Sequence, residues 1–299
     1  MPEAMTAKIW DVHCHFPRNW ENPEDSDPAK EIDLRADALR AAGVVKASLL
    51  SGGRMGLGYD ESLVYARRHE DLFVPSAMID PDEITPREVR RLHSIGYRGL
   101  KMIGVRRPYD DYKYFGVYQV AEELDMPILM HMGVIGGGVD YSITHPRRDP
   151  KAVESLERMV RMGRNQPRDV SAIRMRPFHM DTIANNFPSL KLIGAHMGGT
   201  GNYDEAASVT RWRHNVYLDL SGGDTIERHA VERRLVGHEI GVEKITWGSD
   251  CGNDEIGPHV SNLERLFDQV ALTEDQKHRI RWANAAEVFG FETPARAAE

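Results

Sequence analysis

Eight short apolar runs, separated by stretches with the spacing of amphipathic helices, constrain the fold of this chain more than any other feature. Between the runs, apolar residues recur three and four positions apart, as in Val117, Val120 and Leu124. This alternation predicts parallel strands joined by helices. The expected strands are Lys8–Val12, Val44–Leu50, Leu72–Ile79, Gly99–Ile103, Pro127–Met130, Leu190–Ala195, Val216–Leu220 and Lys244–Trp247.

Eight parallel strands are the number that closes a barrel, so we expect a single-domain (β/α)8 (TIM) barrel over residues 1–299, with its core at about 8–291. A length of 299 residues would also suit two domains, but the eight-strand count sets this aside. A doubly wound open sheet is the alternative. That fold typically carries a glycine-rich phosphate loop after its first strand, where this chain reads HCHFPRNW.

Composition excludes several classes of protein. The net charge of −8 and the lack of a basic block argue against a nucleic-acid partner. No apolar run approaches the roughly 18 residues of a membrane span, and no signal-peptide pattern is evident. Two cysteines cannot form a disulfide framework. We therefore expect a cytoplasmic protein that acts on a small molecule.

Long loops after the expected strands indicate where a site would lie. Gly52–Asp60, Val105–Phe115 and Gly133–Pro150 follow strands, whereas short links such as SIG and LDM precede them. In a barrel, the loops after the strands form the C-terminal face, which carries the active site.

His13 and His15 lie one residue apart where the first run ends. Side chains alternate along a strand, so both rings would project into the barrel and Cys14 would point into the helical layer. Imidazole binds Zn²⁺ at about 2.0–2.1 Å, and two such residues can share one ion. Surface or core histidines are the alternative at this point.

Three further strand ends strengthen the metal interpretation. His131, His196 and Asp250 are each the first titratable residue after an apolar run. Packing alone does not explain buried polar groups at four strand ends, because each needs a partner. A divalent ion would supply that partner. The pattern does not separate the ligands from a catalytic base, and no partner arrangement is evident for Ser221 or Cys251.

The segments DVHCHF, PILMHMG, FPSLKLIGAHMGG, ITWGSD and ANAAEVFGF resemble the amidohydrolase superfamily. They are most similar to its amidohydrolase-2 branch, which includes aminocarboxymuconate-semialdehyde decarboxylase. The resemblance implies that His13, His15, His131 and Asp250 bind a single divalent metal ion, preferably Zn²⁺. It also implies that His196 contacts the reacting water or the substrate, and it suggests a homo-oligomer.

Four basic residues near the expected C-terminal face of the barrel each have two possible roles. Lys101 is either a lysine buried beside the site or, as in binuclear members of the superfamily, a carbamylated bridge between two metals. Arg54, Arg106 and Arg107 follow strands. A guanidinium there would clamp a substrate carboxylate, or would simply lie on the surface.

The five site residues permit two reactions. Asp250 could accept a proton from an attacking water while His196 stabilises the oxyanion, which describes hydrolysis of an amide, lactone or ester. The same residues could orient a carboxylated substrate for non-oxidative decarboxylation. We expect the metal-dependent hydrolase first and the carboxy-lyase second. A barrel that binds a ligand without catalysis is a third hypothesis, against which all five residues argue.

Overall fold

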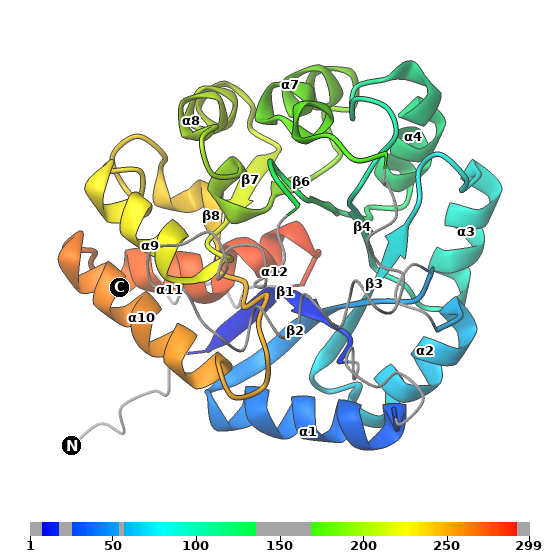
Figure 1. Cartoon of the computed structure of the whole chain (residues 1–299), viewed down its shortest axis with the longest axis horizontal. Coiled ribbons are helices and arrows are strands. Elements are labelled where there is room, and N and C mark those ends of the chain that lie inside the picture. Colours follow the sequence, from blue (N-terminus) through cyan, green and yellow to red (C-terminus); the bar gives the residue numbers. More distant parts are fainter. Residues whose placement is uncertain (1–7, 18–25, 54–56, 136–168, 292–299) are drawn as a thin grey trace, which may run out of the picture.

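The computed structural model describes residues 8–17, 26–53, 57–135 and 169–291. Within them, eight strands form one sheet in which each strand pairs in parallel with the next along the chain. The strands surround a common axis and the helices lie outside them (Figure 1). The expected single-domain (β/α)8 barrel is thus confirmed. The strands are β1 (Ile9–His15), β2 (Val44–Ser51), β3 (Phe73–Ile79), β4 (Gly99–Met102), β5 (Ile128–Met130), β6 (Leu192–Gly194), β7 (Val216–Asp219) and β8 (Ile245–Thr246).

Two backbone hydrogen bonds join the last strand region to the first. The Val12 amide donates to the Trp247 carbonyl at 3.0 Å, and the Asp250 amide donates to the His13 carbonyl at 2.9 Å. These bonds connect the two edge strands of the sheet and bring it close to a closed barrel. They also tie the segment that carries Asp250 to the strand that carries His13.

Helices follow the strands and begin at residues suited to that position. Asp27 accepts hydrogen bonds from the amides of Ala29 and Lys30 at the start of α1, and Thr85 caps α3 in the same way. None of the helices in the described ranges is long and apolar enough for a membrane crossing. The helices are α1 (Pro28–Ala41), α2 (Tyr59–Ala66), α3 (Pro86–Ile95), α4 (Phe115–Glu123), α7 (Pro177–Asn186), α8 (Tyr203–Trp212), α9 (Gly223–Glu232), α10 (Ile256–Gln269), α11 (Glu274–His278) and α12 (Asn284–Val288), with short helical turns η3 (Arg67–His69), η4 (Tyr112–Tyr114), η5 (Ala172–Met175), η6 (His196–Gly198), η7 (Val242–Lys244) and η8 (Arg279–Ala283).

The apolar core has two parts. One large cluster fills the space between the strands and the helices and includes Cys14 and Leu49. A smaller cluster collects side chains such as Trp10 and Leu50, together with residues of α12. Trp10 is fully buried and stacks on Phe289 with ring centroids 5.3 Å apart. The inside of the barrel is therefore filled by apolar side chains near the start of β1, away from its histidines.

A β-bulge in β1 determines which side chains enter the barrel. Asp11 pairs with Ala47 and Cys14 with Leu49, so β1 spans three steps where β2 spans two. Val12 belongs to the inner cluster, and simple alternation would then turn His13 outward. The extra residue restores the inward direction for His13 and His15 and leaves Cys14 in the outer cluster.

Candidate active site

The structure brings together the five residues expected at the strand ends. His13 and His15 lie in the last three residues of β1, His131 follows β5, His196 opens η6 after β6, and Asp250 follows β8. All five lie at the C-terminal end of the barrel, which is the end where TIM-barrel enzymes carry their chemistry.

Asp250 lies at the centre of this group. Its Oδ1 is 3.2 Å from His15 Nε2 and 3.6 Å from His13 Nε2, and its Oδ2 is 3.7 Å from His196 Nε2. His196 Nε2 in turn lies 3.3 Å from His131 Nδ1. One carboxylate thus contacts three imidazoles, and the fourth ring adjoins the third.

Among the described residues, two groups of three have donor atoms within 4.8 Å of one another. His13, His15 and Asp250 form the first, which contains three of the four predicted ligands. The second contains His13 and His196 with Asp219, a residue that the sequence analysis did not select. His131 belongs to neither group, although it adjoins His196.

Burial keeps His13 and His131 neutral. It lowers the pKa of His13 to about 4, and the Lys101 ammonium acts in the same direction. Burial also holds the pKa of His131 well below its usual value. For Asp250, burial would raise the pKa, but three neighbouring histidines outweigh it and hold the pKa well below the usual range. Neutral imidazoles and an ionised carboxylate are the protonation states that bind a metal ion.

The hydrogen bonds of His13 and His131 each use one ring nitrogen as a donor. The other ring nitrogen then has a lone pair that faces other acceptors. His13 Nδ1 lies 2.8 Å from Asp219 Oδ2, which can only accept, so the Nε2 lone pair faces Asp250. His131 Nε2 donates to the Val134 carbonyl at 3.2 Å, which leaves Nδ1 as an acceptor. The Lys101 ammonium partners the lone pair of His13 Nε2, and the other acceptors that converge here still need a cation or a shared proton between them. The residues present therefore fit a divalent metal ion.

Lys101 lies buried beside this group, which is the first of the two alternatives considered for it. The side chain is fully buried, and its Nζ is 3.1 Å from His13 Nε2. Burial lowers the pKa of Lys101 to about 8, while Asp250 and Asp219 act against that shift. In the metal-free site, Lys101 is therefore mainly the ammonium at pH 7, inside the barrel.

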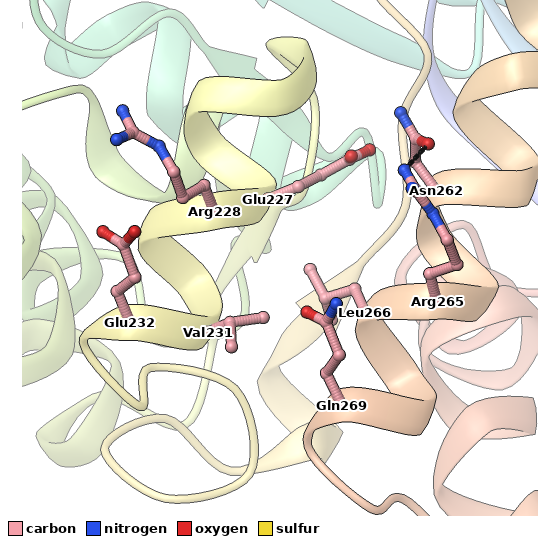
Figure 2. A pocket seen from close by; sticks show the side chains of 8 residues that line it. All are labelled: Glu227, Arg228, Val231, Glu232, Asn262, Arg265, Leu266 and Gln269. Carbon is pink, nitrogen blue, oxygen red and sulfur yellow. Dashed lines mark hydrogen bonds between the residues drawn. The ribbon is translucent and has the colours of Figure 1, made fainter.

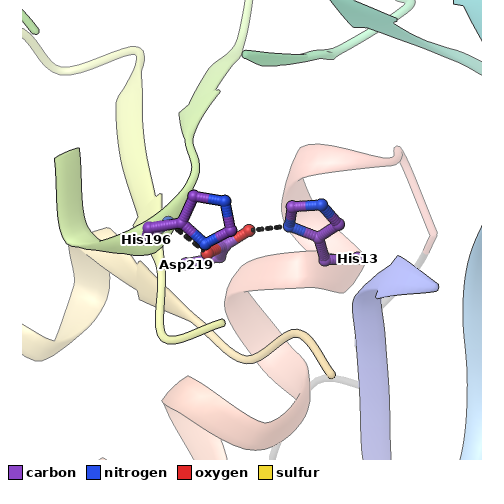
Figure 3. Close-up of side chains that lie close together, drawn as sticks. All are labelled: His13, His196 and Asp219. Atoms are coloured by element: carbon purple, nitrogen blue, oxygen red, sulfur yellow. Dashed lines mark hydrogen bonds and ion pairs between the residues drawn. The ribbon is translucent and has the colours of Figure 1, made fainter. Parts of the chain in front are cut away.

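Asp219 and Ser221 are the residues that sequence reasoning missed. Asp219 is fully buried at the end of β7, between His13 and His196 (Figure 3). Its Oδ1 accepts hydrogen bonds from the Ser221 hydroxyl at 2.5 Å and from the His196 amide at 2.8 Å. Ser221, for which no partner was expected, also reaches both histidine rings. Asp219 could have been found, because it is the carboxylate of its apolar run.

Backbone strain marks the segments that hold two of these residues. His196 has φ of 58° and Asp250 has φ of 47°, a region that residues with a side chain rarely adopt. Hydrogen bonds from the amides of both residues, to Asp219 Oδ1 and to the His13 carbonyl, hold them there. Strain of this kind is typical of functional sites whose surroundings impose the conformation.

The loop arginines are engaged with acidic side chains. Arg106 forms an ion pair with Glu83 at 2.8 Å, and Arg107 lies 3.5 Å from Asp111. Both arginines are exposed. Arg54 lies outside the described residues. The role of all three as substrate ligands stays a prediction.

Two other features do not belong to the site. Burial raises the pKa of Cys251 to about 12, which disfavours the nucleophilic thiolate. A cavity of about 290 Å³ lies between α9 and α10, where Glu232 and Gln269 are among its lining residues (Figure 2). None of the histidines or aspartates described above lines it.

A family model described as "Amidohydrolase" matches residues 10–291. The chain belongs to this amidohydrolase family. The resemblance seen in its motifs is thereby confirmed, and so is its membership of an enzyme superfamily whose members act on small molecules with the help of a metal ion. A search of curated protein sequences finds no significant match.

Solved structures share the fold at low sequence identity. One is a 5-carboxyvanillate decarboxylase from Sphingomonas paucimobilis, with 15% identity, a TM-score of 0.61 and coverage of 96% of this chain and 100% of that chain. A probable 2-pyrone-4,6-dicarboxylic acid hydrolase from Acinetobacter baumannii has 14% identity, a TM-score of 0.61 and coverage of 95% and 99%. A dihydroxybenzoic acid decarboxylase from Polaromonas sp. JS666, with bound manganese and an inhibitor, has 17% identity, a TM-score of 0.56 and coverage of 95% and 97%.

Proposed function

We propose that this protein is a metal-dependent enzyme that acts on a small carboxylated ring compound, and that it releases the carboxylate as CO2. The observation that supports the metal-dependent part is the convergence of His13, His15 and Asp250, with His131 and His196 beside them, at the C-terminal end of the barrel.

The proposed metal ligands are His13, His15, His131 and Asp250, as the family resemblance implies. A bound divalent ion would supply Lewis acidity, which polarises substrate oxygens or makes a water more acidic. Imidazole and carboxylate ligands suit Zn²⁺, and the manganese in one similar structure leaves Mn²⁺ as the alternative.

The charge of the site favours an anionic substrate. Asp219 and Asp250 are carboxylates with lowered pKa values, and Lys101 is an ammonium at pH 7. In the metal-free site the three together carry one negative charge, and a divalent ion would make the site positive as long as Lys101 keeps its proton. In a buried site of low dielectric, that excess attracts a substrate carboxylate strongly.

Decarboxylation needs a proton for the carbon atom that loses CO2. The bond between that carbon and the carboxylate breaks, the electron pair stays on the ring, and a proton then takes the place of CO2. His196 is the proposed proton carrier, because its Nε2 faces the group formed by Asp250 and His131. This nitrogen would first take up a proton from solvent and then pass it to the ring carbon, which returns His196 to its neutral form. Two of the similar structures, the 5-carboxyvanillate and dihydroxybenzoic acid decarboxylases, are named for reactions on carboxylated aromatic rings.

Hydrolysis is the second candidate, and it is the reaction that the sequence analysis put first. It is supported by the family description and by the similar structure named as a probable hydrolase of a pyrone dicarboxylic acid. Here Asp250 would accept the proton of an attacking water, and His196 would stabilise the oxyanion.

One experiment separates the two reactions. Protein loaded with Zn²⁺ or Mn²⁺ is incubated with hydroxybenzoates, lactones and amides in ¹⁸O-labelled water. We expect CO2 release without ¹⁸O in the ring product. Incorporation of ¹⁸O into the product without CO2 release would support hydrolysis instead.

Two variants complete the test. His196→Asn should keep the metal and lose turnover, whereas Ser48→Ala, a buried serine that bonds Trp10 and no site residue, should behave as the wild type. Full activity of His131→Ala without bound metal would contradict the metal-dependent mechanism.

A further inference from the structure

Both carboxylate oxygens of Asp219 form hydrogen bonds, one with the ring of His13 and the other with Ser221 and the His196 amide. Oδ2 lies 2.8 Å from His13 Nδ1. Oδ1 accepts from the Ser221 hydroxyl at 2.5 Å, from the Ser221 amide at 3.0 Å and from the His196 amide at 2.8 Å. We call Asp219 and Ser221 together the Asp219–Ser221 clip.

The tautomer of His13 follows from its two neighbours. An ionised carboxylate only accepts hydrogen bonds and an ammonium only donates them. Asp219 faces Nδ1 and Lys101 faces Nε2 at 3.1 Å. Both contacts require the proton on Nδ1 and the lone pair on Nε2.

The tautomer of His196 follows from Ser221. A hydroxyl has one proton, and that of Ser221 is donated to Asp219 Oδ1. Towards His196 Nδ1, at 2.9 Å, the Ser221 oxygen can therefore only accept. The Ser221 carbonyl, 3.3 Å from the same nitrogen, is also an acceptor. His196 must carry its proton on Nδ1, so that Nε2 faces Asp250.

We propose that the Asp219–Ser221 clip is a positioning device that sets the Nδ1–H tautomer of both His13 and His196 and so presents both Nε2 atoms to the site. Asp219 acts directly on His13, and it acts on His196 through Ser221. The inference rests on the proposed function, in which His13 is a metal ligand and His196 carries the proton. Outer partners of this kind orient metal-binding histidines in general.

Two variants separate the halves of the clip. In Asp219→Asn, the side-chain amide can donate to His13 Nδ1 while the Lys101 ammonium still donates to Nε2, so the two partners conflict and His13 loses its single tautomer. In Ser221→Ala, Asp219 still accepts from His13, but His196 loses its hydroxyl partner. Ser48→Ala removes a hydroxyl that is likewise fully buried and bonded, yet contacts none of these histidines.

Nitrogen NMR of protein labelled with ¹⁵N-histidine reads the tautomers directly, without a substrate. We expect Nδ1–H for His13 and His196 in the wild type and in Ser48→Ala. His13 should show a mixture of tautomers in Asp219→Asn only. His196 should show a mixture in Ser221→Ala, where the backbone carbonyl at 3.3 Å is the Nδ1 acceptor that remains, while His13 keeps its own tautomer. Metal affinity should fall by about 10–100-fold in Asp219→Asn, and far less in Ser221→Ala.

Unchanged tautomers and metal affinity in Asp219→Asn would overturn the proposal. If Asp219→Asn does not fold, an unchanged His196 tautomer in Ser221→Ala would overturn it equally. If the tautomers are as expected but no tested substrate is turned over, the proposal for the clip is supported and the proposed function is refuted.

Discussion

Gly248 offers a way to displace His13 without altering any donor atom. A Cβ added at Gly248 would lie 2.5 Å from His13 Cβ and 3.2 Å from its amide nitrogen. Carbon atoms at their best separation are about 3.5–4.0 Å apart, so Gly248→Ala must move β1 by roughly 1 Å at this residue. The displaced part is backbone and Cβ, which no rotamer change can relieve.

We expect Gly248→Ala to weaken metal binding by about 100-fold, because a shift of roughly 1 Å is large against the ~0.2 Å tolerance of metal–ligand distances. Overpacking should also reduce the free energy of unfolding by about 1–3 kcal/mol. Isothermal titration calorimetry with Zn²⁺ measures the first effect and urea unfolding the second. Gly257→Ala is the matched control, since a Cβ there meets nothing within 4 Å. Metal affinity of Gly248→Ala equal to that of Gly257→Ala would refute the placement of His13 as a ligand.

Three further predictions concern stability. Trp10→Ala should lower the free energy of unfolding by about 3–5 kcal/mol, since Trp10 is fully buried inside the barrel; a loss below about 1 kcal/mol in urea unfolding would contradict that packing. The metal-free protein should lose stability as the pH falls from 6.5 to about 4, because His13 stays neutral when folded and takes up a proton when unfolded; this one group contributes on the order of 3 kcal/mol, and an unfolding free energy that is flat over this range would refute it. A metal at 100 times its Kd should add about 2.7 kcal/mol, measured as a rise in Tm that dipicolinic acid reverses; an unchanged Tm would argue against the site.

The barrel could be predicted because each of its strands corresponds to an apolar run in the sequence. Each expected range overlaps an observed strand, but the ends differ. The first strand continues to His15, since Cys14 and His15 pair with Leu49 and Leu50 of β2. The last one shortens to Ile245–Thr246. Strand ends depend on the pairing partner, which a single run of residues does not contain.

The bulge in β1 could not be predicted from the residues. Alternation along a regular strand correctly predicted that His13 and His15 lie on the same side. Trp10 and Val12, however, point into the barrel, and in a regular strand both histidines would then point outward. The extra residue is visible only in the register against β2. Asp11 supports it, since its Oδ1 accepts from the amides of His13 and Ser249, both at 2.9 Å.

The site was predictable where a polar residue ends an apolar run and was missed where one lies inside it. His131, His196 and Asp250 were selected by that criterion. Asp219 was not, because it lies inside the run VYLDL and was counted as part of the strand. Ser221 could not be found, because its importance lies in contacts with His13 and His196, more than 20 residues away. The surroundings of Arg106 and Arg107 likewise depend on Asp82 and Glu83 of the β3–α3 loop, which no local pattern ties to them.

The most direct test of the metal centre is anomalous X-ray diffraction from crystals grown with Zn²⁺ or Mn²⁺. The account predicts one strong anomalous peak about 2.0–2.2 Å from His13 Nε2, His15 Nε2, His131 Nδ1 and an oxygen of Asp250. A peak elsewhere, or no peak among these four residues in a crystal soaked with metal, would contradict it.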